Sequence, residues 1–153
     1  DAGLAAHSNE PLDKDKQLAD SLKSTEHTLV DMGADEFTEG KPHPMVDSSQ
    51  RVERILAEAQ DPETAVILLD CILGYVASDD PGGEIAPVIA QAKRTAKQRG
   101  DELSVVVSVC GTELDHQGMD QQVAVLEQAG ATVFKSGLQA AEYAVQLVSG
   151  RTQ

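Results

Sequence analysis

The sequence predicts an α/β fold, a three-layer sandwich in which helices cover both faces of a parallel sheet. Four apolar segments with strand character alternate with four segments of helical periodicity between residues 27 and 150. Each interval between strands is long enough for a crossover helix and far too long for a hairpin. Uninterrupted apolar runs in the strands fit a sheet that is covered on both faces.

The N-terminal third is expected to hold an arm, a first strand and a long loop. Residues 1–26 are polar and irregular, so they are assigned to an arm or linker, and residues 27–150 to the domain proper. Residues 27–33 form a short apolar stretch ending at a glycine, which predicts a strand with its exit turn. The following loop, 34–47, has a length typical of functional or disordered segments.

The first helix of the domain is predicted from an apolar stripe on one face. Its members recur at positions i, i+3, i+4 and i+7: Val52, Ile55, Leu56 and Ala59. Asp47 and Gln50 precede the stripe at capping-box spacing, and Pro62 follows it. A continuous apolar strand is then expected over residues 65–74.

Two more strands and three more helices complete the pattern. The second helix is marked by apolar residues between 85 and 96 and is expected to stop at Gly100. Pro87 fits this helix only if it lies in the first turn. The remaining elements are a strand over 103–110, a helix ending at Gly130, a strand over 132–135 and a helix over 138–148.

The charge balance excludes several classes of protein. The chain has 26 Asp and Glu against 12 Lys and Arg, a net charge of −14, and such a surface repels nucleic-acid backbones and anionic lipids. The longest apolar runs are far too short to cross a bilayer. We therefore expect a cytoplasmic protein that binds neither nucleic acid nor membrane.

The cysteines and histidines do not indicate a disulfide framework or a metal site. Cys71 and Cys110 lie within or at the end of apolar strands, where small buried residues of a reduced protein are expected. His7, His27 and His116 lack the spacing of metal ligands, so no metal site is expected. The chain also contains neither a Gly-x-x-x-x-Gly-Lys phosphate loop nor a Gly-x-Ser-x-Gly elbow.

The carboxyl ends of the predicted strands are the expected place for a ligand. Glycine recurs at all four ends, in residues 31–33, 70–74, 110–113 and 136–137. Helix N-termini that follow these ends would supply N–H groups and partial positive charge, which suit a phosphate or a carboxylate. The alternative is that each glycine serves only the geometry of a strand-to-helix turn.

Three further features are candidates for chemistry, each with a structural alternative. Two flanking prolines fix the backbone of His43, so the imidazole could face an anion or a proton-transfer site, or simply occupy a rigid surface turn. Cys110 could place a thiol near a ligand or fill a strand end as a small hydrophobe. The carboxylates of residues 79–80 could bind a cation, and Asp80 could instead cap a helix.

Several motifs point to a known family. The element Gly-Lys-Pro-His-Pro-Met lies within residues 27–47, and further characteristic segments are residues 68–75 with Asp80 and Pro81, residues 109–113 and residues 122–131. Together they resemble the signature of FdrA-type proteins, which are relatives of succinyl-CoA synthetase. The resemblance extends over nearly all of residues 2–147.

The resemblance implies a flavodoxin-like CoA-ligase domain, similar to the C-terminal domain of the β subunit of the synthetase. In that superfamily an acyl group, a phosphate carried on histidine and CoA are exchanged at a site shared between domains. CoA and a nucleotide, ADP or ATP, are therefore expected with the full protein, although this chain shows no cofactor motif of its own. By position, the substrate-binding residues would be Gly74, Tyr75, Gly111, Thr112 and Glu113. His43 would be the catalytic residue, contacting an anion or transferring a proton.

The chain departs from the family pattern in three respects. Leu73 and Gly74 stand where the synthetase has a Gly-Gly pair, and a phosphohistidine loop is missing, so direct succinyl-CoA synthetase activity is not expected. Family members also carry a strand just before the segment that matches Ala2. Here the chain begins at Asp1, with neither Met nor leader, and is expected to be incomplete after cleavage or truncation.

The missing strand has a consequence for partners, because in a doubly wound sheet the first strand lies in the middle and its absence would expose apolar edges. We expect a preceding segment or another chain, such as another domain or subunit of the same enzyme, to fill its place. The predicted function is that of a C-terminal domain of an FdrA-like acyl-CoA synthetase subunit that handles an anionic acyl or phosphoryl ligand. Two alternatives remain: a subunit of an oxamate carbamoyltransferase in purine-ureide breakdown, and a non-catalytic assembly domain.

Overall fold

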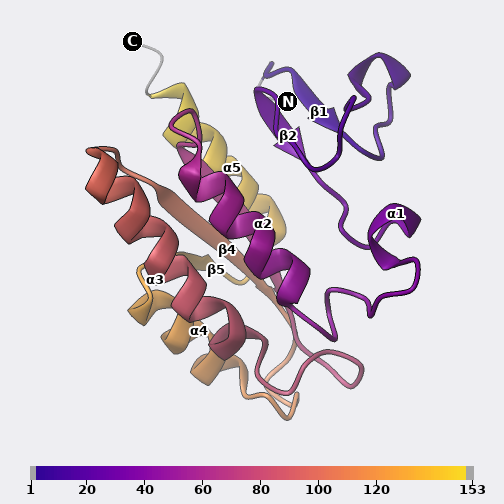
Figure 1. Ribbon diagram of the computed structural model, residues 1–153. Coiled ribbons are helices and arrows are strands. Elements are labelled where there is room, and N and C mark those ends of the chain that lie inside the picture. The colour runs from indigo at the N-terminus through magenta and orange to yellow at the C-terminus, as the bar shows by residue number, and fades with distance from the viewer. Residues whose placement is uncertain (1–2, 151–153) are drawn as a thin grey trace. The chain divides into compact units, whose positions relative to one another are not determined.

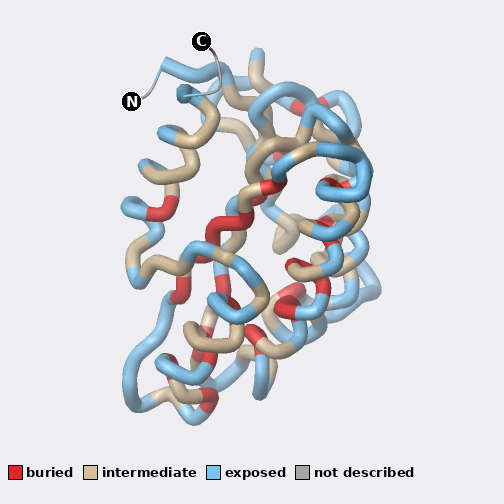
Figure 2. Tube along the Cα trace, turned by 90° about the vertical axis from the view of Figure 1, so that its left-hand side faces the viewer, coloured by how far each residue is buried: buried red, intermediate tan, exposed pale blue. Residues whose placement is uncertain are grey.

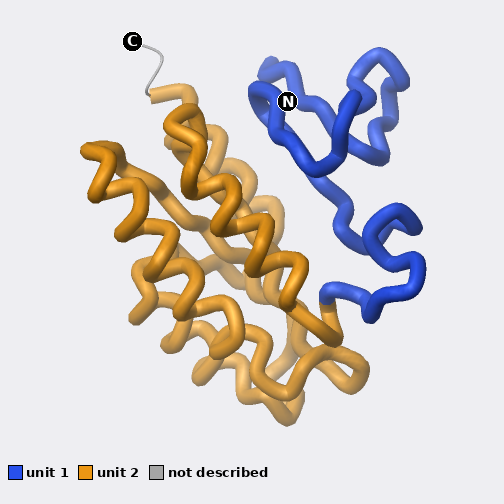
Figure 3. Tube along the Cα trace, viewed as in Figure 1, with its two compact units in different colours: residues 1–44 blue, residues 45–153 orange. Residues whose placement is uncertain are grey.

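Parallel strand pairing organises the structure, a computed structural model that describes residues 3–150 (Figure 1). A three-stranded sheet has the order β3-β4-β5, and a separate two-stranded sheet pairs β1 with β2. The chain divides into two compact units, residues 1–44 (unit 1) and residues 45–153 (unit 2) (Figure 3). This division falls after Pro44, whereas the sequence expectation placed the boundary after residue 26.

The sheet of unit 2 confirms the predicted α/β fold with parallel strands. Strand β3 (Val66–Ile72) pairs in parallel with β4 (Ser104–Cys110), with Val66 opposite Ser104 and Ile72 opposite Cys110. Strand β5 (Thr132–Phe134) pairs in parallel with the other edge of β4. The strands are shorter than the predicted apolar segments, because their outer residues turn into the loops.

Helices cover both faces of this sheet, as the sequence predicts. Helices α2 (Ser49–Gln60), α3 (Pro81–Arg99) and α4 (Met119–Gln128) pack on one another in sequence order, and α3 and α4 lie on the face that bears the side chains of Ile67, Val105 and Val107. Helix α5 (Gly137–Ser149) packs on β3, β4 and β5 from the opposite face, where Val106 is fully buried. Buried positions, red in Figure 2, recur along the strands and on the inner sides of the helices.

Helix α3 begins and ends as the sequence predicts, but it contains a proline in an unexpected place. Asp80 is the N-cap, and its side chain accepts a hydrogen bond from the N–H of Gly83. Gly100 ends the helix with a φ of 92°, a left-handed conformation that glycine adopts without strain. Pro87 is the seventh residue of a helix that starts at Pro81, so the expectation that it lies in the first turn was wrong. Since a proline lacks the N–H that would bond back four residues, the carbonyl of Gly83 loses its helical donor there.

Helix α2 has a different N-cap from the predicted one. Ser48 occupies the cap position without a side-chain cap bond, whereas Asp47 accepts a hydrogen bond from the N–H of Ser49 at 2.9 Å. The hydrogen bond from the side chain of Ser49, and after it the one from its N–H, lower the pKa of Asp47. Asp47 therefore still satisfies one terminal N–H, in a turn one residue earlier than a capping box would place it.

Unit 1 differs most from the sequence expectation. Residues 1–26 were assigned to an arm, but they contain β1 (Ala6–Ser8) and a short 3-10 helix, η1 (Lys14–Lys16). The predicted strand at 27–33 is β2 (His27–Leu29), which pairs in parallel with β1 rather than with the sheet of unit 2. His27 and Leu29 are exposed, so this strand lacks the two buried faces of a central strand. A short helix, α1 (Asp35–Thr38), lies in the predicted long loop.

Candidate functional site

The loops at the carboxyl ends of β3, β4 and β5 form one edge of unit 2, which we call the rim and define as residues 73–80, 111–118 and 135–137. Because neighbouring strands are parallel, these three loops emerge on the same side of the sheet. Gly74 begins the first loop with a φ of 129°, a conformation that few other residues adopt. The rim therefore brings together the five predicted substrate-binding residues: Gly74, Tyr75, Gly111, Thr112 and Glu113.

A buried glutamine ties the first loop of the rim to the second. The N–H of Gly74 donates to Oε1 of Gln117 at 3.2 Å, and Nε2 of Gln117 donates to the carbonyl oxygens of Gly74 at 2.8 Å and of Ser78 at 3.0 Å. Gln117 is only 4% exposed, so these bonds form away from solvent. The loop that carries Tyr75 is thus held at both ends by one amide side chain.

A second buried glutamine, Gln122 of α4, forms hydrogen bonds with the N-terminus of α3. The N–H of Gly82 donates to Oε1 of Gln122 at 2.7 Å, and Nε2 of Gln122 donates to Oδ1 of Asp80 at 2.9 Å. The N–H of Gly83 is taken by Asp80. The sequence suggested that helix N-termini at the rim offer N–H groups to an anion, but these N–H groups of α3 already donate to side chains of the protein.

The second loop is also held by a side chain. The N–H and Oγ1 of Thr112 both donate to Oδ2 of Asp115, at 2.6 and 3.2 Å. A Cβ at Gly111 would lie 2.7 Å from Cβ of Leu73, so the close approach of the two loops requires glycine at this position. Nζ of Lys135, in the third loop of the rim, lies 3.6 Å from Oε1 of Glu113 in the second loop.

The surface of the rim is apolar and acidic. Tyr75, Val76 and Leu114 are largely exposed, as is Leu138 in the first turn of α5 just beyond the rim. The three rim segments contain Asp79, Asp80, Glu113 and Asp115 but only one lysine and one histidine.

Both of these basic groups are already paired. Nζ of Lys135 lies 3.2 Å from Oδ1 of Asp120, and this hydrogen bond raises the pKa of Lys135. Nε2 of His116 lies 3.0 Å from Oδ1 of Asp79. An anion at the rim would therefore need positive charge from a source beyond these two residues.

His43 belongs to unit 1 and not to the rim. Its Nε2 would lie 2.7 Å from a Cβ at Gly33, and the N–H of Gly33 donates to Oδ1 of Asp31 at 2.8 Å. Asp31 is held in turn by the buried Asn9, whose Oδ1 accepts its N–H and whose Nδ2 donates to its carbonyl. The imidazole thus packs over the glycine turn that follows β2.

The two cysteines have different environments. Cys71 lies in the core of unit 2 and burial raises its pKa to about 11. Cys110 is exposed at the end of β4, so the expectation of a buried residue there was wrong. By the alternation of the strand, the side chain of Cys110 lies on the same face of the sheet as that of Val106.

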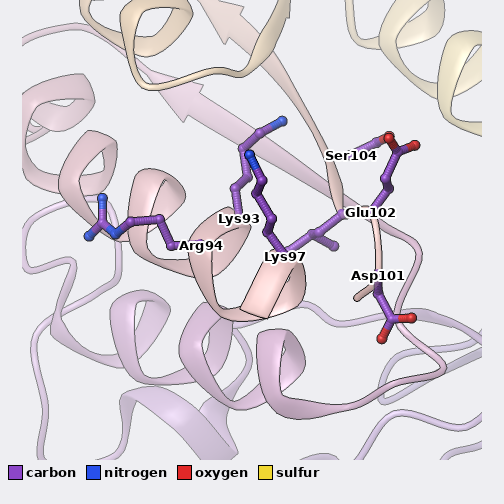
Figure 4. A pocket seen from close by; sticks show the side chains of 7 residues that line it. Lys93, Arg94, Lys97, Asp101, Glu102 and Ser104 are labelled. Atoms are coloured by element: carbon purple, nitrogen blue, oxygen red, sulfur yellow. The ribbon is translucent and has the colours of Figure 1, made fainter. Parts of the chain in front are cut away.

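Two concave pockets are lined by residues outside the rim. A pocket of about 470 Å³ is lined by the C-terminal half of α3 and the start of β4, at the amino end of that strand and thus opposite the rim (Figure 4). Its lining combines Lys93, Arg94 and Lys97 with Asp101 and Glu102. A pocket of about 410 Å³ in unit 1 is lined by Asp35, Thr38 and Glu39. Among residues 3–150, no group of His, Cys, Asp and Glu has the arrangement of a metal site.

Sequence reasoning missed the residues that hold the rim together, namely Asp115, Gln117 and Gln122. Nothing in the local sequence separates Gln117 from the exposed Gln121. The only signal is the helical position of Gln122, which lies four residues before the fully buried Leu126 and thus on the inner face of α4.

Comparison with known proteins is consistent with this fold. A family model described as CoA-ligase matches residues 2–147, so the chain belongs to the CoA-ligase family. Among curated proteins, "Uncharacterized protein YahF" of Escherichia coli (strain K12) is 41% identical over 141 residues. That match covers 90% of this chain and 27% of YahF, so the chain spans about a quarter of the length of its relative. None of the helices in the described part of the chain is long and apolar enough to cross a membrane.

Proposed function

We propose that the chain is a CoA-ligase-type domain of an FdrA-like acyl-CoA synthetase subunit, and that its rim takes part in binding CoA with an anionic acyl or phosphoryl group. The observation that carries this proposal is the family match over residues 2–147 together with a parallel sheet whose glycine-containing loops gather at one edge. Ligands of open parallel sheets bind at this edge.

Each predicted site residue has a role within this proposal. The exposed phenol ring of Tyr75 offers a face on which the adenine of CoA, or of ADP or ATP, can stack. Gly74 and Gly111 allow the ligand to approach the backbone, while Thr112 and Glu113 supply polar groups beside it. His43 would contact the anionic group or transfer a proton when unit 1 is engaged with the ligand.

The charge of the rim supports a site that is shared with other polypeptide. The lysine and the histidine of the rim are paired with carboxylates, and the N–H groups of Gly82 and Gly83 are occupied by side chains. The rim therefore binds the uncharged parts of a ligand better than its phosphates, and other domains or subunits would supply the cations.

The proposal is tested by titrating the isotopically labelled chain with CoA, ADP, carbamoyl phosphate and oxamate, while its amide resonances are followed by NMR. We expect CoA at millimolar concentration to shift the amides of Gly74, Tyr75 and residues 111–113. Tyr75→Ala should raise the Kd for CoA about tenfold, because it removes a stacking contact of roughly 1.4 kcal/mol.

Leu12→Ala is the matched control, since Leu12 is a fully exposed apolar residue of unit 1. It should leave the Kd for CoA unchanged. CoA shifts confined to the basic pocket of Lys93 and Lys97, or no shifts with any ligand, would contradict the proposal and favour an assembly role.

A further inference from the structure

Strand β3 has a free edge. The N–H of Ser104 donates to the carbonyl of Ala65 at 3.0 Å, and the N–H of Leu73 donates to the carbonyl of Cys110 at 2.8 Å. In a parallel ladder these two bonds and the register place the backbone groups of the odd-numbered residues of β3 toward β4. The N–H and C=O groups of the even-numbered residues, Val66, Leu68, Asp70 and Ile72, therefore point away from β4.

Most of these edge groups have no partner among residues 3–150. The exception is the carbonyl of Asp70, which accepts a hydrogen bond from the guanidinium of Arg51 in α2. A seven-residue strand with an unpaired edge is a template for pairing with a further strand.

The composition of β3 is that of a central strand. Its sequence, Val-Ile-Leu-Leu-Asp-Cys-Ile, contains no lysine or proline and is not interrupted by a bulge, so it lacks the features with which exposed edges are protected. Leu68 is 45% exposed, while Val106, its neighbour on β4, is fully buried on the same face. Helix α5 thus covers the middle of the sheet and leaves the outer side of β3 open.

Helices on both faces flank this edge. Helix α2 packs mainly on α3 rather than on β3, and its Arg51 reaches the edge carbonyl of Asp70. Val52 and Leu56 on the inner side of α2 are only half-buried. Helix α5 lies across the opposite face of β3. A further strand paired with this edge would lie about 4.8 Å from β3.

We propose that the free edge of β3 binds one additional strand that runs parallel to it and is supplied by a polypeptide segment of the kind that makes up the remaining length of YahF. YahF has further polypeptide outside the matching segment, because the match covers only 27% of its length. All strand pairs of the structure are parallel, and purely parallel sheets are favoured over mixed ones. The added strand should be apolar on the face toward α2, where Val52 and Leu56 are only half-buried, and on its other face it would cover the exposed side of Leu68.

The added strand has a consequence for the rim, which makes the inference an extension of the proposed function. A parallel strand beside β3 would end next to Gly74, so the residues that follow it would join the rim. These residues would supply the positive charge that the rim lacks. The pairing itself can be tested without any ligand.

The test is hydrogen exchange of the full chain, resolved to single amides by NMR. In the chain alone, the amides of Leu68 and Ile72 should exchange rapidly, while those of Leu69 and Cys71, which bond to β4, should be protected. Overlapping synthetic peptides that cover YahF outside its matching segment are then added in turn. At least one apolar peptide should slow the exchange of Leu68 and Ile72 by about tenfold or more, because their amides become hydrogen-bonded.

Leu68→Lys should abolish this protection, since a lysine on a strand edge opposes pairing. Leu138→Lys is the matched control, because Leu138 is an exposed leucine of α5 just beyond the rim, and it should leave the protection intact. Unchanged circular dichroism spectra would establish that both variants fold.

Three results would overturn the inference. They are protection of the Leu68 and Ile72 amides in the monomer without peptide, protection that rises with protein concentration together with a dimer in sedimentation, and no protection by any peptide. If no peptide gives protection but CoA shifts the amide resonances of the rim, the proposed function is retained and only the inference of an added strand is overturned.

Discussion

Neighbouring residues of β3 alternate between a buried and an exposed environment. Cys71 is fully buried between the sheet and α3, whereas its neighbour Asp70 is exposed and accepts from Arg51 on the free edge. Burial raises the pKa of Cys71 to about 11, and the charges of Asp70 and Asp80 act in the same direction, while Arg51 opposes them. The thiol is therefore kept neutral by its surroundings and is not a reactive group.

Cys71 should make the protein lose stability in alkali. An unfolded thiol ionises near pH 9.0 and the folded one near 11, so the unfolded state releases the proton first as the pH rises. The free energy of unfolding should be unaffected by this group below pH 9 and should fall by roughly 2–3 kcal/mol between about pH 9 and 11. Urea titrations across this range measure the loss.

Cys71→Ala should remove this alkaline loss, although the variant is less stable at neutral pH because it leaves a small cavity. Cys110→Ala should keep it, since Cys110 is exposed at the end of β4. An alkaline loss of the same size in the Cys71→Ala variant would assign it to another group.

Between elements, the junction of α3 and α4 depends on Gln122. This side chain accepts from Gly82 of α3, donates to Asp80, and donates to the carbonyl of Gln117 before α4. A Cβ at Gly82 would lie 2.7 Å from Oε1 of Gln122, so the glycine makes room for the amide. The two helices are thus joined by hydrogen bonds where the apolar core ends.

Gln122→Ala should lower the free energy of unfolding by about 2–3 kcal/mol, because it leaves the buried N–H of Gly82 without an acceptor. Gln121→Ala is the matched control one position away, and its exposed side chain should make a difference of at most about 0.5 kcal/mol. Urea denaturation followed by circular dichroism measures both. Equal effects of the two substitutions would show that the hydrogen bonds of Gln122 contribute little.

The elements that sequence periodicity predicted correctly are those with a large buried face. Helices α2 to α5 and strands β3 to β5 all appear where apolar residues recur with the period of a helix or form a continuous run. The pairing of β2 with β1 could not be predicted, because three-residue strands carry too little pattern to identify a partner. The hydrogen-bond partners of Gln117 and Gln122 were also beyond prediction, although helical spacing indicates that Gln122 is buried, since an amide gains its partners only when distant loops meet.

At the scale of the whole molecule, the main cluster of buried apolar residues belongs to unit 2. The residues of the buried cluster and those packed against it all lie between Val52 and Val133. Both tyrosines of the chain, Tyr75 and Tyr143, also lie in this unit, and there is no tryptophan. The ring of Tyr143 packs 5.4 Å from that of Phe134, so tyrosine fluorescence reports the folding of unit 2.

We therefore expect the unfolding of unit 2 to be independent of substitutions at buried positions of unit 1. Phe37→Ala, which removes a buried side chain of α1, should change the free energy of unfolding measured by tyrosine fluorescence by at most about 0.5 kcal/mol. Leu126→Ala should lower it by about 3–4 kcal/mol, because Leu126 is fully buried in the core of unit 2. A similar loss in both variants would mean that the units unfold together.

The parallel pairing of β3, β4 and β5 also determines how the chain can fold. Each pair closes only after an entire intervening helix has formed or collapsed, so no hairpin is available to nucleate the sheet. Pairing between strands that are far apart in the sequence is slow. During synthesis, β3 with its apolar side chains emerges from the ribosome well before β4 can pair with it. The nascent chain is thus exposed to self-association during that interval, and molecular chaperones that hold extended apolar segments would act on this protein at the stage when β3 is already out and β4 is not.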